Sequence, residues 1–577
     1  MRRLLTLGLA TAALFTHTLL RAQSGTRYAY PVRDVPGLCA ANFGEIRPGH
    51  FHAGVDIKTD GAEGKPLVAV ADGWLSRAVI APYGYGRALY LTLPDGTTAV
   101  YGHLQRFRDD LEAVLRDERY RRRANNLDLT FDAGRWPVKR GDVIGYSGNS
   151  GSSGGPHLHF ELREAGSGRR LNLVRAGIIR PKDDLPPRIM RIHWIDVDTV
   201  QGIPLHGRPE SYAVVRQAEG RYRLTREEPV PVGRKGYFVA EVTDRRNDVH
   251  NTFGIWRLTA SVDGTPYFEY RMDGFTYDLS RCCDAVSCYP LQLGSRNEVL
   301  RLAQLEGAPG CFYTVMEDRG VLRTAAGEKR RIRIEVEDDS GNRSSLEFTV
   351  CGRSDRPAPP AFAPESRILR RDRTSTAAVG SEAGAHIPAG ALYEDCAVRP
   401  DRCPRPEVPA GVAVLSPSYR LLGSDTPLRQ AATVLIRCDV PRPLQLRTML
   451  AVRSSKGKLT PAGGAYAGGV VTAQTRTLDG VTVVADTLPP AIRPRFAEGA
   501  NLAQASSLRF SVSDNFSGVT ACTLHIDGRW VPCDRLPMQG LLFHTFDTPP
   551  ARSRHRVQLT VRDAAGNTAG WEGTFYR

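Results

Sequence analysis

A diverged internal repeat is the feature that most limits how this chain can fold. Asp184–Pro187 reads Asp-Leu-Pro-Pro and Asp486–Pro490 reads Asp-Thr-Leu-Pro-Pro, and a similar succession of short motifs follows each. The first is followed by Val-Thr-Asp, Gly-Ile, Val-Asp-Gly and Asp-Ser-Gly-Asn, and the second by Val-Ser-Asp, Gly-Val, Ile-Asp-Gly and Ala-Ala-Gly-Asn. Short β-branched runs between such turns predict antiparallel β-sandwiches.

The 577 residues are too many for one hydrophobic core, so several folded units are expected. Both repeats resemble the immunoglobulin-like modules appended to exported bacterial proteins. The Pro-rich stretch Arg356–Pro364 predicts an extended linker between the first repeat and the next domain. The sequence predicts a signal peptide (1–22), a first domain (23–185), an immunoglobulin-like sandwich (186–352), a linker (353–372), a β-rich domain without recognisable chemistry (373–486) and a second immunoglobulin-like sandwich (487–577).

The N-terminus predicts export. A basic start, Met1-Arg2-Arg3, precedes an apolar run from Leu4 to Leu20 that is too short to span a bilayer comfortably, which is typical of a signal peptide cleaved after Ala22. No later stretch is long and apolar enough for a transmembrane segment. We therefore expect the mature chain in the periplasm or at the cell exterior, where its eleven cysteines would meet an oxidising environment.

One disulfide is predicted from strand register, and the odd cysteine count leaves at least one thiol unpaired. Asp527-Gly528 favours a two-residue hairpin turn, which sets Ile526 opposite Arg529 and then Cys522 opposite Cys533. Directly opposed residues of a hydrogen-bonded pair lie about 5.5 Å apart at Cα, a separation that suits a disulfide.

Strand-like runs dominate the first domain, at Val68–Leu75, Leu89–Leu93, Val143–Ser147 and His157–Leu162. The exception is Asp109–Arg123, whose apolar residues recur with helical spacing and predict one amphipathic helix. Such an insertion is most often a peripheral elaboration, and a lid or a partner-binding element are the alternatives. The fold class is therefore all-β.

The net charge of +15 admits two interpretations. It would favour association with an anionic envelope polymer or lipid, but the arginines are spread along the whole chain, as in a generally arginine-rich protein. No nucleic-acid-binding module is recognisable, so the charge does not indicate DNA or RNA as a partner.

Histidines gather in three short motifs of the first domain. These are His52-Ala-Gly-Val-Asp56, Tyr101-Gly-His-Leu104 and a glycine-rich segment that ends in Pro-His-Leu-His-Phe-Glu161. His157 and His159 share one face of a strand, because side chains alternate along it. Together with His52 and Asp56 they offer the histidines and carboxylate of a catalytic zinc site, whose fourth position is left to water.

The three motifs in this order resemble the lysostaphin/LytM-type metallopeptidases, also called the glycyl-glycine endopeptidase family, over about residues 40 to 165. The resemblance implies an antiparallel β-sheet peptidase domain in which His52, Asp56 and His159 bind Zn²⁺. It implies that His103 and His157 form the catalytic pair. We expect His157 to transfer the proton of the attacking water, and His103 to orient that water and stabilise the tetrahedral intermediate.

The function implied is zinc-dependent hydrolysis of the peptide cross-links of bacterial peptidoglycan. Two alternatives stay open: a non-catalytic envelope factor that binds peptidoglycan or activates another cell-wall hydrolase, and a metallopeptidase that acts on proteins. The C-terminal modules would position the enzyme or bind an envelope protein partner. His50 is expected to be a non-ligand, and Glu161 either bonds a ligand histidine or faces outward.

Overall fold

The computed structural model describes residues 28–353, 362–363, 365–454, 456–547 and 553–577. The predicted signal peptide and the Pro-rich centre of the linker lie outside these residues. The described chain is built mainly of β-strands, and its longest helix is α1 (Asp109–Arg122), so the all-β fold class is confirmed. None of the described helices has both the length and the apolar character needed to cross a membrane.

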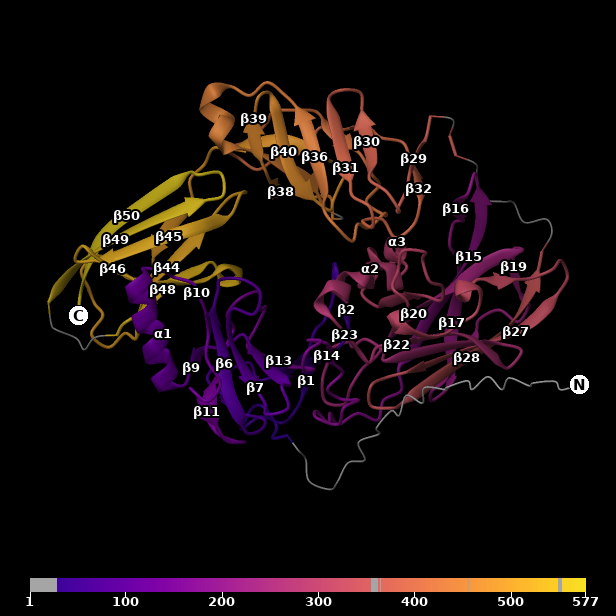
Figure 1. The fold of residues 1–577 in the computed structure, drawn as a ribbon, viewed down its shortest axis with the longest axis horizontal. Coiled ribbons are helices and arrows are strands. Elements are labelled where there is room, and N and C mark those ends of the chain that lie inside the picture. The colour runs from indigo at the N-terminus through magenta and orange to yellow at the C-terminus, as the bar shows by residue number, and fades with distance from the viewer. Residues whose placement is uncertain (1–27, 354–361, 364, 455, 548–552) are drawn as a thin grey trace, which may run out of the picture.

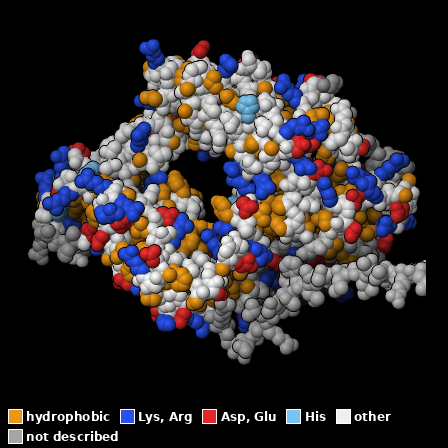
Figure 2. Space-filling view, viewed as in Figure 1, with side chains coloured by type: hydrophobic (Ala, Val, Ile, Leu, Met, Phe, Trp, Pro, Cys, Tyr) orange, Lys and Arg blue, Asp and Glu red, His pale blue; other side chains and the backbone are white. Residues whose placement is uncertain are grey.

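Four β-rich domains follow one another around a central opening, and the last returns to the first (Figure 1). The opening is also visible between the side chains in the space-filling view, where basic side chains gather at its edge (Figure 2).

The first domain is an antiparallel sheet in the order β1-β4-β13-β8-β7-β6-β10, beside a small sheet in the order β5-β12-β9. Its central strand, β13, turns Leu158, Phe160 and Leu162 into the hydrophobic core, so the alternate residues face the other way. The elements are β1 (Cys39–Ala41), β2 (Ile46–Arg47), β3 (His50–Phe51), β4 (Val55–Lys58), β5 (Pro66–Val68), β6 (Gly73–Ile80), β7 (Arg87–Thr92), β8 (Thr98–Gly102), β9 (Arg106–Phe107), α1, β10 (Leu127–Thr130), β11 (Pro137–Val138), β12 (Val143–Tyr146), β13 (His157–Arg163) and β14 (Arg170–Leu171).

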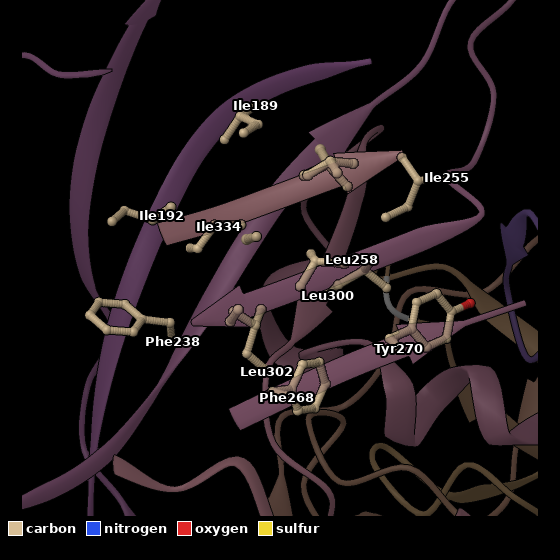
Figure 3. Close-up of a cluster of buried hydrophobic side chains, with 14 of the residues drawn as sticks. Ile189, Ile192, Phe238, Ile255, Leu258, Phe268, Tyr270, Leu300, Leu302 and Ile334 are labelled. Carbon is tan, nitrogen blue, oxygen red and sulfur yellow. The ribbon is translucent and has the colours of Figure 1, made fainter. Parts of the chain in front are cut away.

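The first repeat packs its strands around a large apolar core that contains Ile192, Phe238 and Leu300 (Figure 3). Phe43 and Phe51 of the first domain enter the same core and lie 5.2 and 5.6 Å from Phe275, measured between ring centroids. The first domain and the first repeat are therefore fused through shared packing.

The strands of this repeat are β15 (Arg188–Val200), β16 (Ile203–His206), β17 (Glu210–Ala218), β18 (Arg221–Leu224), β19 (Val230–Val232), β20 (Lys235–Thr243), β21 (Arg257–Val262), β22 (Thr265–Arg271), β23 (Gly274–Phe275), β24 (Glu298–Arg301), β25 (Tyr313–Met316), β26 (Leu322–Arg323), β27 (Lys329–Glu337) and β28 (Arg343–Gly352). Its short helices are η1 (Tyr277–Cys282), α2 (Cys283–Val286), α3 (Tyr289–Gln292), η2 (Gly310–Phe312) and η3 (Asp318–Gly320).

The third domain has its main sheets in the orders β30-β31-β36-β40-β39 and β34-β41-β37-β38. Its elements are β29 (Arg367–Leu369), β30 (Ser375–Val379), β31 (Ala383–Ile387), β32 (Cys396–Val398), β33 (Asp401–Cys403), β34 (Val412–Val414), β35 (Ser418–Arg420), β36 (Ala432–Arg437), η4 (Arg442–Arg447), β37 (Thr448–Arg453), β38 (Leu459–Gly463), β39 (Ala465–Ala467), β40 (Val470–Thr475) and β41 (Thr482–Asp486).

The second repeat stacks the sheets β42-β44-β48-β47 and β43-β50-β49-β45-β46. Apolar residues of both sheets meet in one core, as in a β-sandwich. Its elements are β42 (Ala491–Pro494), β43 (Ala500–Asn501), β44 (Ser507–Ser513), β45 (Val519–Ile526), β46 (Arg529–Val531), β47 (Asp534–Leu536), η5 (Pro537–Gln539), β48 (Leu541–Thr545), β49 (Arg554–Asp563) and β50 (Thr568–Tyr576).

The predicted helix of the first domain is present as α1, and its position shows what it contacts. Tyr120 packs against the core of the second repeat and lies edge-on to Trp530 at 6.0 Å between ring centroids. The Arg119 guanidinium donates to the carbonyl oxygen of Cys533 at 3.2 Å. The helix is therefore a docking element for the last domain and not a free peripheral insertion.

The predicted hairpin between Cys522 and Cys533 also forms, with Ile526 opposite Arg529. The two sulfur atoms lie 3.3 Å apart, and all eleven cysteines are free thiols in this structure. Asn125 of the first domain donates from Nδ2 to the Cys522 carbonyl and accepts at Oδ1 from the Cys533 N–H. The disulfide remains a prediction for the oxidised protein.

Candidate metal centre

Strand pairing brings the three histidine motifs together. β13 lies between β4 and β8, and its register sets His159 opposite Asp56 on one side and opposite Gly102 on the other. The first motif thus runs into β4, the second spans the end of β8, and the third runs into β13. Residues more than a hundred positions apart meet because their strands are neighbours in one sheet.

Three buried donor atoms form a tight triangle. Asp56 Oδ1 lies 3.0 Å from His52 Nε2 and 2.8 Å from His159 Nδ1, and the two nitrogens lie 3.1 Å apart. Tetrahedral zinc with bonds of about 2.0–2.1 Å would set its ligands about 3.3 Å apart. The triangle therefore fits a zinc-sized ion after small adjustments, and its two imidazoles and one carboxylate are the donor set that zinc prefers.

The charges around this triangle favour a cation. Burial by itself would lower the pKa of His159. The hydrogen bonds and negative charges of Asp56 and Glu161 outweigh this effect and raise that pKa to about 9. Burial instead lowers the pKa of His52 to about 4. The two carboxyls hold positive charge at the position where a metal ion would sit, while His52 keeps a neutral nitrogen available as a ligand.

Each ligand histidine is oriented through its other ring nitrogen. His52 Nδ1 donates to the carbonyl oxygen of Asn42 at 2.7 Å. His159 Nε2 donates to Glu161 Oε1 at 3.0 Å, and Arg163 donates to the second oxygen of that carboxylate at 2.8 Å. These bonds fix the tautomers that turn His52 Nε2 and His159 Nδ1 toward Asp56.

His103 and His157 lie beside the triangle with their ring centroids 4.8 Å apart. His103 Nδ1 donates to the Ser150 carbonyl at 2.8 Å, and His157 Nδ1 donates to the Gly155 carbonyl at 2.8 Å. The second nitrogen of His157, Nε2, lies 3.5 Å from Asp56 Oδ1. In these tautomers each Nε2 carries a lone pair, so each ring can accept a proton or hydrogen bond from a molecule at the centre.

Two backbone features explain the motif spacing. A Cβ added at Gly54 would lie 2.3 Å from the Phe160 carbonyl oxygen and 3.0 Å from His159 Nε2, so only glycine fits at position 54. His103 has a φ of +65°, in the left-handed region that non-glycine residues seldom adopt. This strained conformation follows the end of β8 and aims the ring back toward the centre.

A groove of about 820 Å³ opens over the centre. His52, His103 and His159 line its floor, while Arg281 comes from the first repeat and Arg429 and Arg476 come from the third domain. Residues of three domains therefore line the groove.

Sequence reasoning missed several residues that the structure places at the centre. Tyr85 donates from its hydroxyl to Glu161, and Arg47 donates to Asp56 Oδ2 at 2.9 Å. Asn42 and Ser150 act through backbone carbonyls, for which no sequence signal exists. Of the two interpretations of Glu161, the structure supports the hydrogen bond to a ligand histidine, and His50 is exposed and outside the triangle.

A centre of two histidines and one carboxylate, set in an open groove on an antiparallel sheet, defines the metallopeptidase class of site. Residues 124–172, which contain His157 and His159, match the model of peptidase family M23. This match confirms the predicted resemblance of the first domain to the lysostaphin/LytM-type metallopeptidases. Residues 374–486 match the model of the Zu5-like domain, a resemblance that the sequence motifs had not revealed.

The relatives agree with this assignment. An uncharacterized metalloprotease of Haemophilus influenzae is 33% identical over 129 residues, which are 22% of this chain and 21% of the relative. The DD-carboxypeptidase/endopeptidase Mpg of Neisseria meningitidis serogroup B is 28% identical over 132 residues, 23% of this chain and 24% of its own. The chain thus spans about a quarter or less of these relatives' lengths.

Among solved structures, the catalytic domain of lysostaphin from Staphylococcus simulans is 28% identical. The match covers 21% of this chain and 76% of that one, with a TM-score of 0.16.

Proposed function

We propose that this chain is an exported zinc endopeptidase that hydrolyses the peptide cross-links of bacterial peptidoglycan. The observation that carries the proposal is the triangle of Asp56 Oδ1, His52 Nε2 and His159 Nδ1, beside two further histidines that each present Nε2. The periplasm or the cell exterior is the proposed location, as the N-terminal segment suggests.

His52, Asp56 and His159 would hold the ion, which when bound supplies a water of lowered pKa and polarises the scissile carbonyl. His157 is placed to take the proton of that water at Nε2 and to pass it to the leaving amine. Burial, together with the nearby His157 and His159, lowers the pKa of His103 to about 3. A neutral His103 accepts a hydrogen bond at Nε2, so it is better suited to orienting water than to donating to the tetrahedral intermediate.

The groove supports an anionic peptide as substrate. Arg47, Arg281, Arg429 and Arg476 line it, against a single acidic residue, Asp278. Burial and the neighbouring Arg281 lower the pKa of Arg476, which indicates like charges held close together. An anionic ligand would relieve this repulsion, and the peptides of peptidoglycan carry free carboxylates.

Purified peptidoglycan would be digested with the mature protein, and released fragments followed by mass spectrometry with and without a chelator. We expect cross-linked dimers to disappear only when zinc is present. His159→Ala should lose both zinc and activity, His157→Ala should keep zinc and lose activity, and His250→Ala, at an exposed histidine outside the centre, should behave as the wild type.

Each other result has a distinct meaning. A folded, zinc-loaded protein that releases no fragments and cleaves no protein substrate would support the non-catalytic envelope factor. Cleavage of a protein with intact peptidoglycan would move the substrate class to proteins. Equal activity of His157→Ala and the wild type would remove the proton-transfer role.

A further inference from the structure

Three aspartates converge at the start of each repeat, far from the histidine centre in sequence. In each cluster, one carboxylate oxygen from every residue lies within 4.8 Å of the others. The first cluster, here called the first triad, consists of Asp183, Asp244 and Asp338, and the second triad consists of Asp486, Asp514 and Asp563.

The two triads occupy equivalent places. Asp183 and Asp486 belong to the segments that lead into the repeats, just before Leu-Pro-Pro. Asp244 and Asp514 directly follow β20 and β44, which pair with the opening strands β15 and β42 of their repeats. The remaining members lie where β27 and β49 end: Asp338 follows β27, and Asp563 is the last residue of β49. The repeat therefore preserves a three-dimensional arrangement as well as a turn pattern.

An asparagine completes both arrangements. Asn342 Nδ2 donates to the Asp183 carbonyl at 3.3 Å and to Asp338 Oδ2 at 2.9 Å. Asn567 Nδ2 donates to the Asp486 carbonyl at 3.0 Å and to Asp563 Oδ2 at 2.8 Å. The same two bonds thus tie each leading segment to the far end of its repeat.

Polar atoms in these clusters lack partners despite deep burial. Asp244 is 0% exposed, and neither of its carboxylate oxygens has a hydrogen-bond partner among the described residues. In the second triad, Asp514 Oδ1 and Oδ1 of the 5%-exposed Asn567 are likewise unpartnered there. Burying a carboxylate oxygen without a partner is unfavourable, so such oxygens indicate a missing positive charge.

One protein cation, the buried Arg246, lies beside the first triad, with its Nε 3.8 Å from Asp183 Oδ2. Its short contacts, at 2.6 and 2.8 Å, are with Asp339, so it forms no hydrogen bond with the triad. No described basic side chain forms an ion pair with the three carboxylates of the second triad, although residues 548–552 nearby in sequence are not described. Like charges this close together, out of water, destabilise one another.

We propose that each triad binds one Ca²⁺ ion, which fastens the repeat to the domain before it. The donors in both triads are carboxylate oxygens, without nitrogen or sulfur, a set that suits a hard cation of flexible coordination. One ligand comes from the leading segment and two from the module, so the ion bridges the junction. Calcium sites of extracellular modules have dissociation constants of about 10⁻⁴–10⁻³ M, which sets the concentration range to explore.

The test is calorimetric titration of the zinc-loaded full chain with Ca²⁺ alone, and with Mg²⁺ for comparison. We expect two Ca²⁺ ions per wild-type chain, one for Asp244→Asn, one for Asp514→Asn and none for the double variant. Asp439→Asn, at an exposed aspartate outside both triads, should bind two. Millimolar Ca²⁺ should also raise the melting temperature of the wild type by several degrees.

A second measurement keeps the proposal falsifiable if a variant fails to fold. Limited proteolysis of the wild type should show that Ca²⁺ protects residues 183–188 and 486–491, because the ion would fix both leading segments. Wild-type protein that binds no Ca²⁺ and gains neither thermal stability nor protection would overturn the proposal. Two ions retained by the folded double variant would overturn it equally. Neither result bears on peptidase activity, which concerns a different site.

Discussion

Arg87 of the first domain and Asp534 of the second repeat form a buried ion pair at 2.9 Å, although 447 positions separate them. Arg119 of α1 reaches the other oxygen of the same carboxylate at 3.1 Å. One carboxylate therefore receives two guanidinium groups, and this contact closes the ring of domains seen in Figure 1. The first domain therefore packs against both repeats, through the shared core with the first repeat and through this ion pair with the second.

Asp534→Asn should open this ring. Removing one partner of a buried ion pair typically costs about 3–5 kcal/mol, because the remaining charges stay buried and unpaired. We expect small-angle X-ray scattering to give a larger radius of gyration for the variant, with each domain still folded. Asp117→Asn, at an exposed aspartate of α1, is the control, and identical scattering from all three proteins would refute the closing role.

Glu161→Gln should weaken zinc binding without removing a ligand. Glu161 accepts the hydrogen bond of His159 Nε2, and substitutions of such supporting groups typically reduce metal affinity 10–100-fold. Competition with a chromophoric chelator measures the change. Glu164→Gln, whose carboxylate pairs with Arg169 instead, should leave the affinity unchanged. An unaltered affinity in Glu161→Gln would mean that the hydrogen bond does not support the ligand.

Gly54→Ala should damage the centre through sterics alone. The added methyl group would lie 2.3 Å from the Phe160 carbonyl oxygen, so β4 and β13 would have to separate. We expect a loss of about 1–3 kcal/mol in unfolding free energy together with weakened zinc binding. A Cβ at Gly154 meets nothing within 4 Å, so Gly154→Ala is the matched control. A Gly54→Ala protein with wild-type stability and zinc content would contradict this prediction.

The arginines of the groove should affect substrate binding more than the chemical step. Arg281→Gln combined with Arg429→Gln removes two positive charges that line the groove but lie outside the first domain. We expect KM for an anionic peptide to rise about tenfold, or about 1.4 kcal/mol, with kcat nearly unchanged. Arg447→Gln, exposed on η4, tests for a general charge effect. An equal KM in the double variant would exclude these arginines from substrate recognition.

His544 should make the second repeat sensitive to acid. Burial lowers the pKa of this histidine, whose Nδ1 donates to the Pro532 carbonyl at 2.7 Å. Below pH 6.5, the histidine's usual pKa, the unfolded chain binds a proton that the folded module resists. Stability is therefore complete above that pH and falls as the pH drops toward the lowered folded value, by at most about 1.4 kcal/mol per pH unit.

The measurement is hydrogen–deuterium exchange of the β48 amides between pH 5 and 8, corrected for the intrinsic pH dependence of exchange. The His544→Gln variant keeps a donor for the Pro532 carbonyl but has no histidine to protonate. Its free energy of opening should therefore fall much less than that of the wild type as the pH drops from 8 to 5. His555→Gln, at a histidine that pairs with exposed Asp527, is the control. The same slope in His544→Gln and the wild type would assign the acid sensitivity to another group.

Local pattern in the sequence predicted the all-β class, the helix around Leu111 and the hairpin between Ile526 and Arg529. Such features depend on side-chain periodicity and turn chemistry within a few residues, which a single sequence displays directly. The resemblance of the three histidine motifs to the lysostaphin/LytM-type metallopeptidases selected His52, Asp56, His103, His157 and His159, which the structure brings together. Strand alternation predicted that His157 and His159 share a face, but not which strands would lie beside them.

Only the tertiary structure determined what surrounds these residues. The Asn42 carbonyl orients His52, Arg281 and Arg429 extend the groove from other domains, and Asp534 closes the ring on Arg87. These contacts join positions that no periodicity relates, and a backbone carbonyl carries no sequence signature. Sequence therefore determined the chemistry that is available, whereas packing between distant segments decided its orientation, its charge environment and its access.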